Sequence, residues 1–231
     1  MKIDKKRKKT LEKVNKEYNY NTKKYENLNT FLSFWFQLKM LSKTKPKNVL
    51  EIGPGEGILA LLAKKSGLKV KTLDIQPELK PDIIADVRKI PQKDNTFDTV
   101  CAFQVLEHIP FEDVKQALKE IKRVSNKYII ISLPYSCFYL SFAFQPFYAK
   151  VFNPIFKLFS LKPFEPKCWN LKIPFFFLDK HGLTKTHAWE LGRKNYPIKK
   201  IRKLFDNLGL KIVKEEDRIF YPYHRFFLLK K

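Results

Sequence analysis

One stretch, Val49 to Gly57, constrains the fold of this 231-residue chain more than any other. It reads Val-Leu-Glu-Ile-Gly-Pro-Gly-Glu-Gly, an apolar run that enters a glycine loop and leads into a helical apolar pattern from Ile58 to Lys65. Three of the chain's seven glycines lie in this loop, more than an ordinary tight turn needs. Because a glycine turn between a strand and a helix exposes backbone N–H groups, the stretch predicts a site for a negatively charged ligand group.

The spacing of the glycines discriminates between nucleotide-binding loops. Gly53 and Gly55 fit the dinucleotide pattern G-x-G-x-x-G, but its third position is Ile58, and the loop lacks the Gly-Lys-Ser/Thr ending of a P-loop. The order E-x-G-x-G-x-G, from Glu51 to Gly57, instead resembles the first motif of class I S-adenosylmethionine-dependent methyltransferases of the type 11-like kind. The resemblance implies that S-adenosylmethionine is the cofactor, and that Glu51 and the three glycines lie near its methionine part.

Hydrophobic periodicity predicts strands and helices that alternate after residue 46. We expect strands at 48–52, 68–75, 82–87, 95–105 and 128–133, and helices at 56–66, 110–124 and 197–208. Two final strands are expected, one at 210–213, with a continuation to Phe220 as the alternative, and one at 223–229. A repeated strand–helix–strand order gives a parallel sheet. The expected fold class is therefore α/β, a Rossmann-like, doubly wound, seven-stranded and mostly parallel sheet, whose last strand the resemblance implies to be antiparallel.

Four regions are expected along the chain. Residues 1–45 are a basic N-terminal helical cap across the cofactor cleft, with a basic arm on an anionic surface as the alternative. Residues 46–134 are the cofactor-binding core, and 196–231 complete it. Between them, 135–195 form a helical and aromatic insertion before the last helix. Within it we expect residues 133–174 to form a lid that faces an apolar substrate or a membrane surface. The alternative is that its aromatic side chains pack inward or against a second subunit.

Further cofactor contacts are expected at the ends of the next strands. Asp74 ends the second strand, where a doubly wound fold holds ribose hydroxyls; a surface aspartate in a turn is the alternative. By analogy with the family, Asp86 contacts the adenine amino group. The remaining expected cofactor contacts are Ile75, Val87 and Gln104.

The run Leu106-Glu107-His108, after the fourth strand, is a second match to the family. We expect His108 to be the base or substrate anchor beside the sulfonium, with Glu107 as the runner-up; the alternative is that both only cap the next helix. His187 is the other catalytic candidate. A helical turn would place it on one face with Glu190, where a purely structural hydrogen bond is the alternative. No metal is expected because dedicated ligand spacing is lacking, although a site formed by His108, His187 and Glu190 remains open.

These features predict methyl transfer to a small-molecule or lipid-like acceptor, at oxygen or carbon. The net charge of +23 suits an anionic partner, so an RNA or protein methyltransferase is one alternative, and a non-catalytic cofactor-binding module is another. The N-P-P-Y and D-P-P-Y motifs of many nucleic-acid amino methyltransferases are absent after the fourth strand. The three widely spaced cysteines and the N-terminus without a secretory signal favour the cytoplasm, with peripheral contact to an anionic membrane as a further expectation. The oligomeric state is left open.

Overall fold

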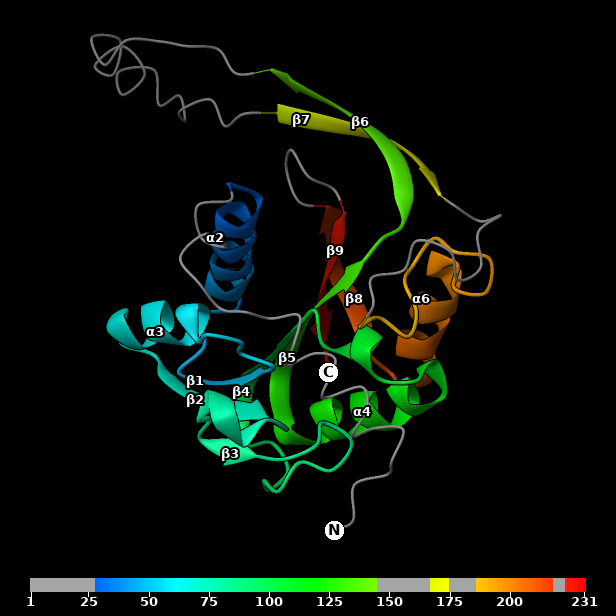
Figure 1. Cartoon of the computed structure of the whole chain (residues 1–231). Coiled ribbons are helices and arrows are strands. Elements are labelled where there is room, and N and C mark those ends of the chain that lie inside the picture. The colour runs from blue at the N-terminus through cyan, green and yellow to red at the C-terminus, as the bar shows by residue number, and fades with distance from the viewer. Residues whose placement is uncertain (1–27, 145–166, 175–185, 218–222) are drawn as a thin grey trace, which may run out of the picture.

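The computed structural model describes residues 28–144, 167–174, 186–217 and 223–231 (Figure 1). Its helices are α2 (Leu28–Thr44), α3 (Ile58–Lys65), α4 (Phe111–Val124) and α6 (Ile198–Asn207), with short 3-10 turns η2 (Pro77–Leu79) and η3 (Leu106–His108). Its strands are β1 (Asn48–Ile52), β2 (Lys69–Asp74), β3 (Ile83–Ile84), β4 (Phe97–Phe103), β5 (Ser125–Pro134), β6 (Cys137–Phe144), β7 (Lys167–Pro174), β8 (Lys211–Asp217) and β9 (His224–Lys230).

Seven of these strands form one sheet in the order β3-β2-β1-β4-β5-β9-β8. The first five are parallel, while β9 pairs antiparallel with both β5 and β8. The predicted α/β class, the seven-stranded sheet and the antiparallel last strand are therefore confirmed.

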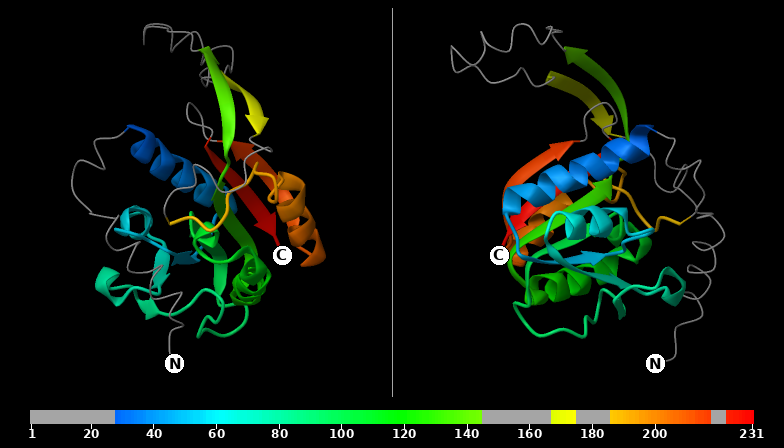
Figure 2. Two further views of the ribbon diagram at one scale, coloured as in Figure 1. Left: turned by 45° about the vertical axis from the view of Figure 1, so that its right-hand side comes forward. Right: turned by 90° about the vertical axis from the view of Figure 1, so that its left-hand side faces the viewer.

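The two faces of the sheet are covered by different helices. Because successive strand residues point to opposite faces, neighbouring residues of one strand pack against different helices. Val49, Cys101 and Ile130 belong to the core cluster that α2 and α3 cover. Their neighbours Leu50 and Ile129 belong to the cluster that α4 and α6 cover. Figure 2 (right) shows α2 and α3 together on the face of the sheet turned to the viewer. Both faces are buried, which explains the unbroken apolar run of β5.

In the described part of the N-terminal region, the spacing of Leu28, Leu32, Trp35 and Leu38 predicts one apolar helical face. Helix α2 packs into the core mainly through other residues. Phe36, Met40 and Leu41 are buried, whereas Leu28 and Trp35, on the predicted apolar face, are 70% and 45% exposed. Phe36 lies 4.9 Å from the ring of Phe226 in β9, so contact with the sheet decides which face is buried. The predicted cap residues before Leu28 lie outside the described range.

Several strand boundaries differ from the predicted ones. The third strand was expected over 82–87, but β3 has only two residues. Asp82 instead accepts hydrogen bonds at Oδ2 from the backbone and hydroxyl of Thr72, which hold it outside the ladder. Strand β5 begins three residues earlier than expected. Strand β8 pairs with β9 and ends at Asp217, between the two expected ends at Val213 and Phe220.

The insertion contains a hairpin where a helical segment was expected. Strands β6 and β7 form a separate two-stranded antiparallel sheet, which rises from the end of β5 beyond the main sheet (Figure 1). Alternation explains this correction: Phe138, Leu140 and Phe142 recur every second residue, the period of a strand. The rest of the predicted lid, 145–166 and 175–185, lies outside the described residues.

Candidate active site

The glycine loop lies at the point where the sheet changes winding direction. Strand β1 has β2 on one side and β4 on the other, and ligands of doubly wound sheets bind at the carboxyl ends of such strands. Gly53 has a φ of 67°, and a Cβ there would lie 2.5 Å from Val105 Cγ2. Gly57, with a φ of 73°, begins α3. Glycine is therefore needed both for the turn and for its close approach to the segment after β4.

Glu51, at the carboxyl half of β1, is a buried acid beside this loop. It is 4% exposed, and its Oε2 has no hydrogen-bond partner within the described residues. Burial raises the pKa of Glu51 to about 8, against the opposing effects of the Ala60 backbone and Lys64. An acceptor left unpaired in the interior is destabilising unless a donor from elsewhere completes it. The ammonium group of S-adenosylmethionine is such a donor, so this residue fits the expected cofactor.

The predicted ribose and adenine residues lie on the neighbouring strands. Asp74 ends β2, where its Oδ1 accepts a hydrogen bond of 2.9 Å from the Gln76 backbone, and burial raises its pKa. Asp86 is 7% exposed, and its Oδ2 lies 3.1 Å from Nη2 of Arg88. Arg88 also pairs with Asp113. If Asp86 binds adenine, its carboxylate therefore has to accept from both the adenine amino group and Arg88.

The other expected cofactor residues follow strands at the same edge of the sheet. Ile75 comes directly after β2, and Val87, which is 7% exposed, follows Asp86. Gln104 leaves β4 with a φ of 56°. Its backbone N–H donates to the Ser132 carbonyl at 3.1 Å, and its side chain donates to the Ser132 hydroxyl at 3.0 Å. The turn after β4 is thus held against β5.

The three predicted catalytic residues come together. The ligand atoms of Glu107, His108 and His187 all lie within 4.8 Å of one another, and the two imidazole rings are 5.1 Å apart. Glu107 is fully buried, and neither of its carboxyl oxygens has a hydrogen-bond partner among the described residues. Burial raises the pKa of Glu107 to about 8. The pKa of His108 is lowered to about 4. Burial is the largest cause, and the neighbouring His187 is the second.

The residues around His187 are packed but not helical, which corrects the expected helical turn. His187 Nδ1 nevertheless lies 2.8 Å from Glu190 Oε1, so the predicted contact is present. Glu190 also accepts hydrogen bonds from Ser136 and, at 2.9 Å, from Tyr223. Although burial alone would raise the pKa of Glu190, the hydrogen bonds from these three side chains hold it below its ordinary value.

Trp189 fixes this segment to the turn that carries Glu107 and His108. Its indole N–H lies 3.2 Å from the carbonyl of Leu106 and 3.1 Å from that of Ile109, and its side chain is completely buried. The backbone N–H of Ala188 donates to the carbonyl of Glu107 at 2.8 Å. Residues 79 or more positions apart in the sequence therefore form one site.

The sequence analysis missed Ser136, Arg193 and Tyr223, which all contact Glu190. Isolated polar residues carry no local signal of such a contact. A glycine gives one retrospective signal: Gly192 has a φ of 83°, and a Cβ there would lie 2.5 Å from the Ser136 carbonyl oxygen. The glycine marks the close approach of the two segments.

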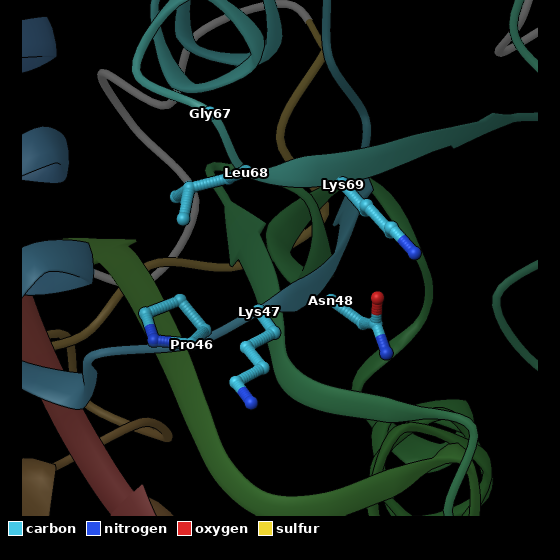
Figure 3. Close-up of a pocket in the computed structure, with 6 residues that line it drawn as sticks. All are labelled: Pro46, Lys47, Asn48, Gly67, Leu68 and Lys69. Carbon is cyan, nitrogen blue, oxygen red and sulfur yellow. The ribbon is translucent and has the colours of Figure 1, made fainter.

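A hollow of about 330 Å³ lies elsewhere, between the start of β1 and the end of α3 (Figure 3). Its lining residues are Pro46, Lys47, Asn48, Gly67, Leu68 and Lys69. Asn48 pairs with Lys69 at the amino ends of β1 and β2. This hollow is therefore at the opposite end of the strands from the glycine loop and is separate from the candidate active site.

The fold and the position of the glycine loop define a Rossmann-like class of nucleotide-binding protein. Within that class, the methyltransferase domain family matches residues 18–215, most of the chain. The protein belongs to this family and is a class I S-adenosylmethionine-dependent methyltransferase.

Solved structures of methyltransferases share the fold. An S-adenosylmethionine-dependent methyltransferase from Archaeoglobus fulgidus is 16% identical with a TM-score of 0.55, covering 87% of this chain and 93% of that one. Magnesium protoporphyrin IX methyltransferase from Synechocystis PCC 6803, with S-adenosylmethionine bound, is 14% identical with a TM-score of 0.53, covering 87% and 81%. S-adenosylmethionine as the cofactor agrees with the sequence-based expectation.

Curated relatives match over shorter stretches. Norajmaline N-methyltransferase from Rauvolfia serpentina is 31% identical over 98 residues, which are 35% of this chain and 33% of that protein. Ribosomal RNA small subunit methyltransferase A from Phytoplasma australiense is 33% identical over 88 residues, 32% of this chain and 31% of its own length. The match thus spans about a third of each relative, and the two act on unlike acceptors.

Replacing Asp74 by alanine tests the ribose assignment. We expect the affinity for S-adenosylmethionine to fall by about 1.5–3 kcal/mol, because hydrogen bonds to a charged group are lost. Isothermal calorimetry on both proteins measures this difference. Asp82→Ala, which removes an exposed aspartate at the start of the following segment, is the control and should retain its affinity. An unchanged affinity in Asp74→Ala would remove the ribose role.

Proposed function

We propose that the protein transfers a methyl group from S-adenosylmethionine to a small, lipid-like acceptor, at a hydroxyl oxygen or an activated carbon. The observation that carries this proposal is an exposed apolar face on the β6–β7 hairpin, which begins directly beside the catalytic cluster. An apolar acceptor needs such a surface near the transferred methyl group.

The geometry and the family resemblance together support the following roles at the site. Glu51 and the glycine loop hold the methionine part of the cofactor, Asp74 the ribose and Asp86 the adenine. Glu107, His108 and His187 anchor the acceptor and handle its proton. In methyl transfer the enzyme must align the acceptor with the methyl group and exclude water. A buried, tightly packed cluster suits both requirements.

The apolar face of the hairpin is defined by its register. Phe138 pairs with Ile173 and Leu140 with Leu171, so these side chains share one face with Phe142. The exposed fractions are 50% for Phe138 and Ile173, 46% for Leu140, 59% for Leu171 and 62% for Phe142. The opposite face is different, because Tyr139 packs against the core. Contiguous exposed apolar side chains of this kind mark a binding surface.

The root of the hairpin is connected to the catalytic cluster. Ser136, one residue before β6, donates to Glu190, which contacts His187. Tyr135 and Leu191 form an isolated bridge between the two segments. An acceptor bound on the hairpin would therefore approach the cluster at this root.

Charge favours an anionic membrane as the source of such an acceptor. The net charge is +23, and residues 145–166, which connect β6 to β7, contain three lysines and one glutamate. Apolar side chains can enter the lipid interface while lysines meet anionic head groups, at about 1 kcal/mol per lysine. No helix within the described ranges is long and apolar enough to cross a membrane. We therefore propose peripheral contact.

RNA is the competing acceptor, which the same net charge favours. Radiolabelled S-adenosylmethionine incubated with lipid, metabolite and RNA extracts distinguishes the two. Label in the organic-soluble fraction supports the proposal. Label in RNA, together with a salt-sensitive RNA gel shift, would replace it with the RNA alternative. Absence of S-adenosylhomocysteine release from every extract would contradict a transferase acting on these acceptors.

Flotation with liposomes tests the proposed surface. We expect the full chain to bind phosphatidylserine-containing vesicles more tightly than neutral ones, and less tightly at high salt. The double variant Phe142→Ser with Leu171→Ser should weaken binding by about 10–100-fold, because both exposed side chains lose their transfer into the interface. Val213→Ser, at a residue that is also 50% exposed but lies on β8, is the matched control. Equal binding by the three proteins, or no flotation, would refute the membrane contact.

A further inference from the structure

The cluster of Glu107, His108 and His187 has the donor set of a metal centre. We propose that these three side chains bind one divalent transition-metal ion, of the zinc type, within the candidate catalytic site. Two imidazole nitrogens and one carboxylate oxygen are the ligands of many catalytic zinc sites, in which the remaining position is left for water or substrate. The sequence analysis expected no metal, and its open alternative used Glu190 in place of Glu107.

The carboxyl group of Glu107 lacks a hydrogen-bond partner among the described residues. This side chain is fully buried, and both carboxyl oxygens are without a hydrogen-bond partner in the part of the chain that the structure describes. The negative charge of Glu190, another acid, further raises the pKa of Glu107 and offers it no compensation. A buried carboxylate needs a cation or hydrogen bonds to offset its lost hydration. An ion held between this carboxylate and the two rings would supply that charge.

The two imidazole rings are held by hydrogen-bond acceptors at Nδ1. Nδ1 of His108 lies 3.2 Å from the Thr186 carbonyl oxygen, and Nδ1 of His187 lies 2.8 Å from Glu190 Oε1. Since both partners are acceptors, Nδ1 donates in each ring, and a neutral ring then carries its lone pair on Nε2. The His108 ring also has a hydrogen bond with the Gln104 backbone, with which an ion has to compete. A metal-binding histidine almost always donates its other N–H to a carboxylate or a backbone carbonyl. Both histidines show this arrangement.

The spacing is close to that of a bound ion. Zinc–ligand distances of about 2.0–2.2 Å place the ligand atoms of a tetrahedral site about 3.4 Å apart. The three ligand atoms here all lie within 4.8 Å of one another. Modest side-chain rotations would bring them together. Glu190 is itself held by Ser136 and Tyr223, so the orientation of His187 is fixed before an ion arrives.

The ion gives the proposed catalytic residues a shared role, and this step alone rests on the proposed function. An acceptor hydroxyl at the open position would have its pKa lowered, so that its proton would leave to bulk solvent as the acceptor binds, before the methyl transfer. The oxygen–methyl bond then forms while the sulfur–methyl bond breaks, and the electron pair of that bond remains on sulfur. The products are the methyl ether and S-adenosylhomocysteine.

Metal binding can be measured without any acceptor. The tag-free full chain, freed of metals with a chelator, is titrated with Co²⁺ and followed by its visible absorption, and Zn²⁺ is then added as a competitor. We expect about one ion per chain. Glu107→Gln and His187→Ala should each weaken binding by more than about 100-fold, and Glu190→Gln by about 10–100-fold, the usual effect of removing a partner of a ligand.

Glu51→Gln is the matched control, because Glu51 is also a buried and incompletely paired acid but does not belong to the cluster of Glu107, His108 and His187. It should bind Co²⁺ like the unaltered protein. Retained S-adenosylmethionine binding shows that Glu107→Gln and His187→Ala remain folded. One folded variant of the two is enough to test the metal site. No Co²⁺ binding by the unaltered protein, or the same affinity in these variants, would overturn the proposal and leave Glu107 as a neutral buried acid. Either result is independent of whether an acceptor is methylated.

Discussion

Replacing His108 by alanine is expected to lower methyl-transfer turnover by about 10²–10⁴-fold, with the affinity for S-adenosylmethionine nearly intact. His108 belongs to the buried cluster after β4, and its ring lies 5.1 Å from that of His187. Removing the ring deletes the group proposed to act on the acceptor, whether directly or through an ion. It does not touch the glycine loop or Asp74, so cofactor binding should persist. Initial rates with the acceptor found in the labelled-cofactor screen give the measurement.

His187→Ala should show the same pattern if the two rings act together. Their effects on turnover should then be less than additive in the double variant, since either loss already disables the cluster. Calorimetry with S-adenosylmethionine serves as the control for each protein. If both single variants lose cofactor affinity to the same extent as turnover, the histidines are structural supports and the catalytic assignment is wrong.

Trp189→Ala is expected to reduce the free energy of unfolding by about 3–5 kcal/mol, the usual loss for a large buried aromatic side chain. Trp189 is completely buried, and its ring lies 5.0 Å from Phe111 and 5.9 Å from Tyr196. The substitution leaves a cavity and removes the donor to the Leu106 and Ile109 carbonyls. For a domain of this size the midpoint of thermal unfolding should fall by about 10 °C. Chemical and thermal denaturation measure both quantities.

Trp35→Ala is the matched control, since this tryptophan on α2 is 45% exposed. Its removal should change the free energy of unfolding by less than about 1 kcal/mol. Trp189→Phe separates packing from hydrogen bonding, because it retains an aromatic ring but loses the indole donor. A Trp189→Ala protein as stable as Trp35→Ala would show that segment 186–196 does not fix the turn that carries Glu107 and His108.

The candidate site was predictable where its residues follow strands. Glu51, Asp74 and Asp86 come at or near the ends of successive parallel strands, and such ends meet at one edge of the sheet. That rule brings together residues distant in the sequence without any knowledge of side-chain packing. The pairing of Asp86 with Arg88 was not predictable, because it depends on how one side chain folds back within a loop.

The insertion shows the opposite case. Its aromatic composition indicated an apolar surface but not its secondary structure, and the expected helical segment proved to be a hairpin where it is described. Which aromatic side chains are exposed depends on the face that meets the core. Tyr139 packs inward, while its neighbours Phe138 and Leu140 remain exposed.

The sequence by itself determined the class of fold and predicted where the cofactor binds, because strand and helix periods, glycine positions and strand-end carboxylates are local properties that one short segment can carry. Only the tertiary structure decided that the proposed catalytic residues lie together. Glu107 and His187 are 80 positions apart, and their proximity depends on Trp189, Glu190 and the approach of Gly192 to Ser136. Such contacts arise from packing between distant segments. Burial then leaves the Glu107 carboxyl group without a partner, and this state has no counterpart in the sequence alone.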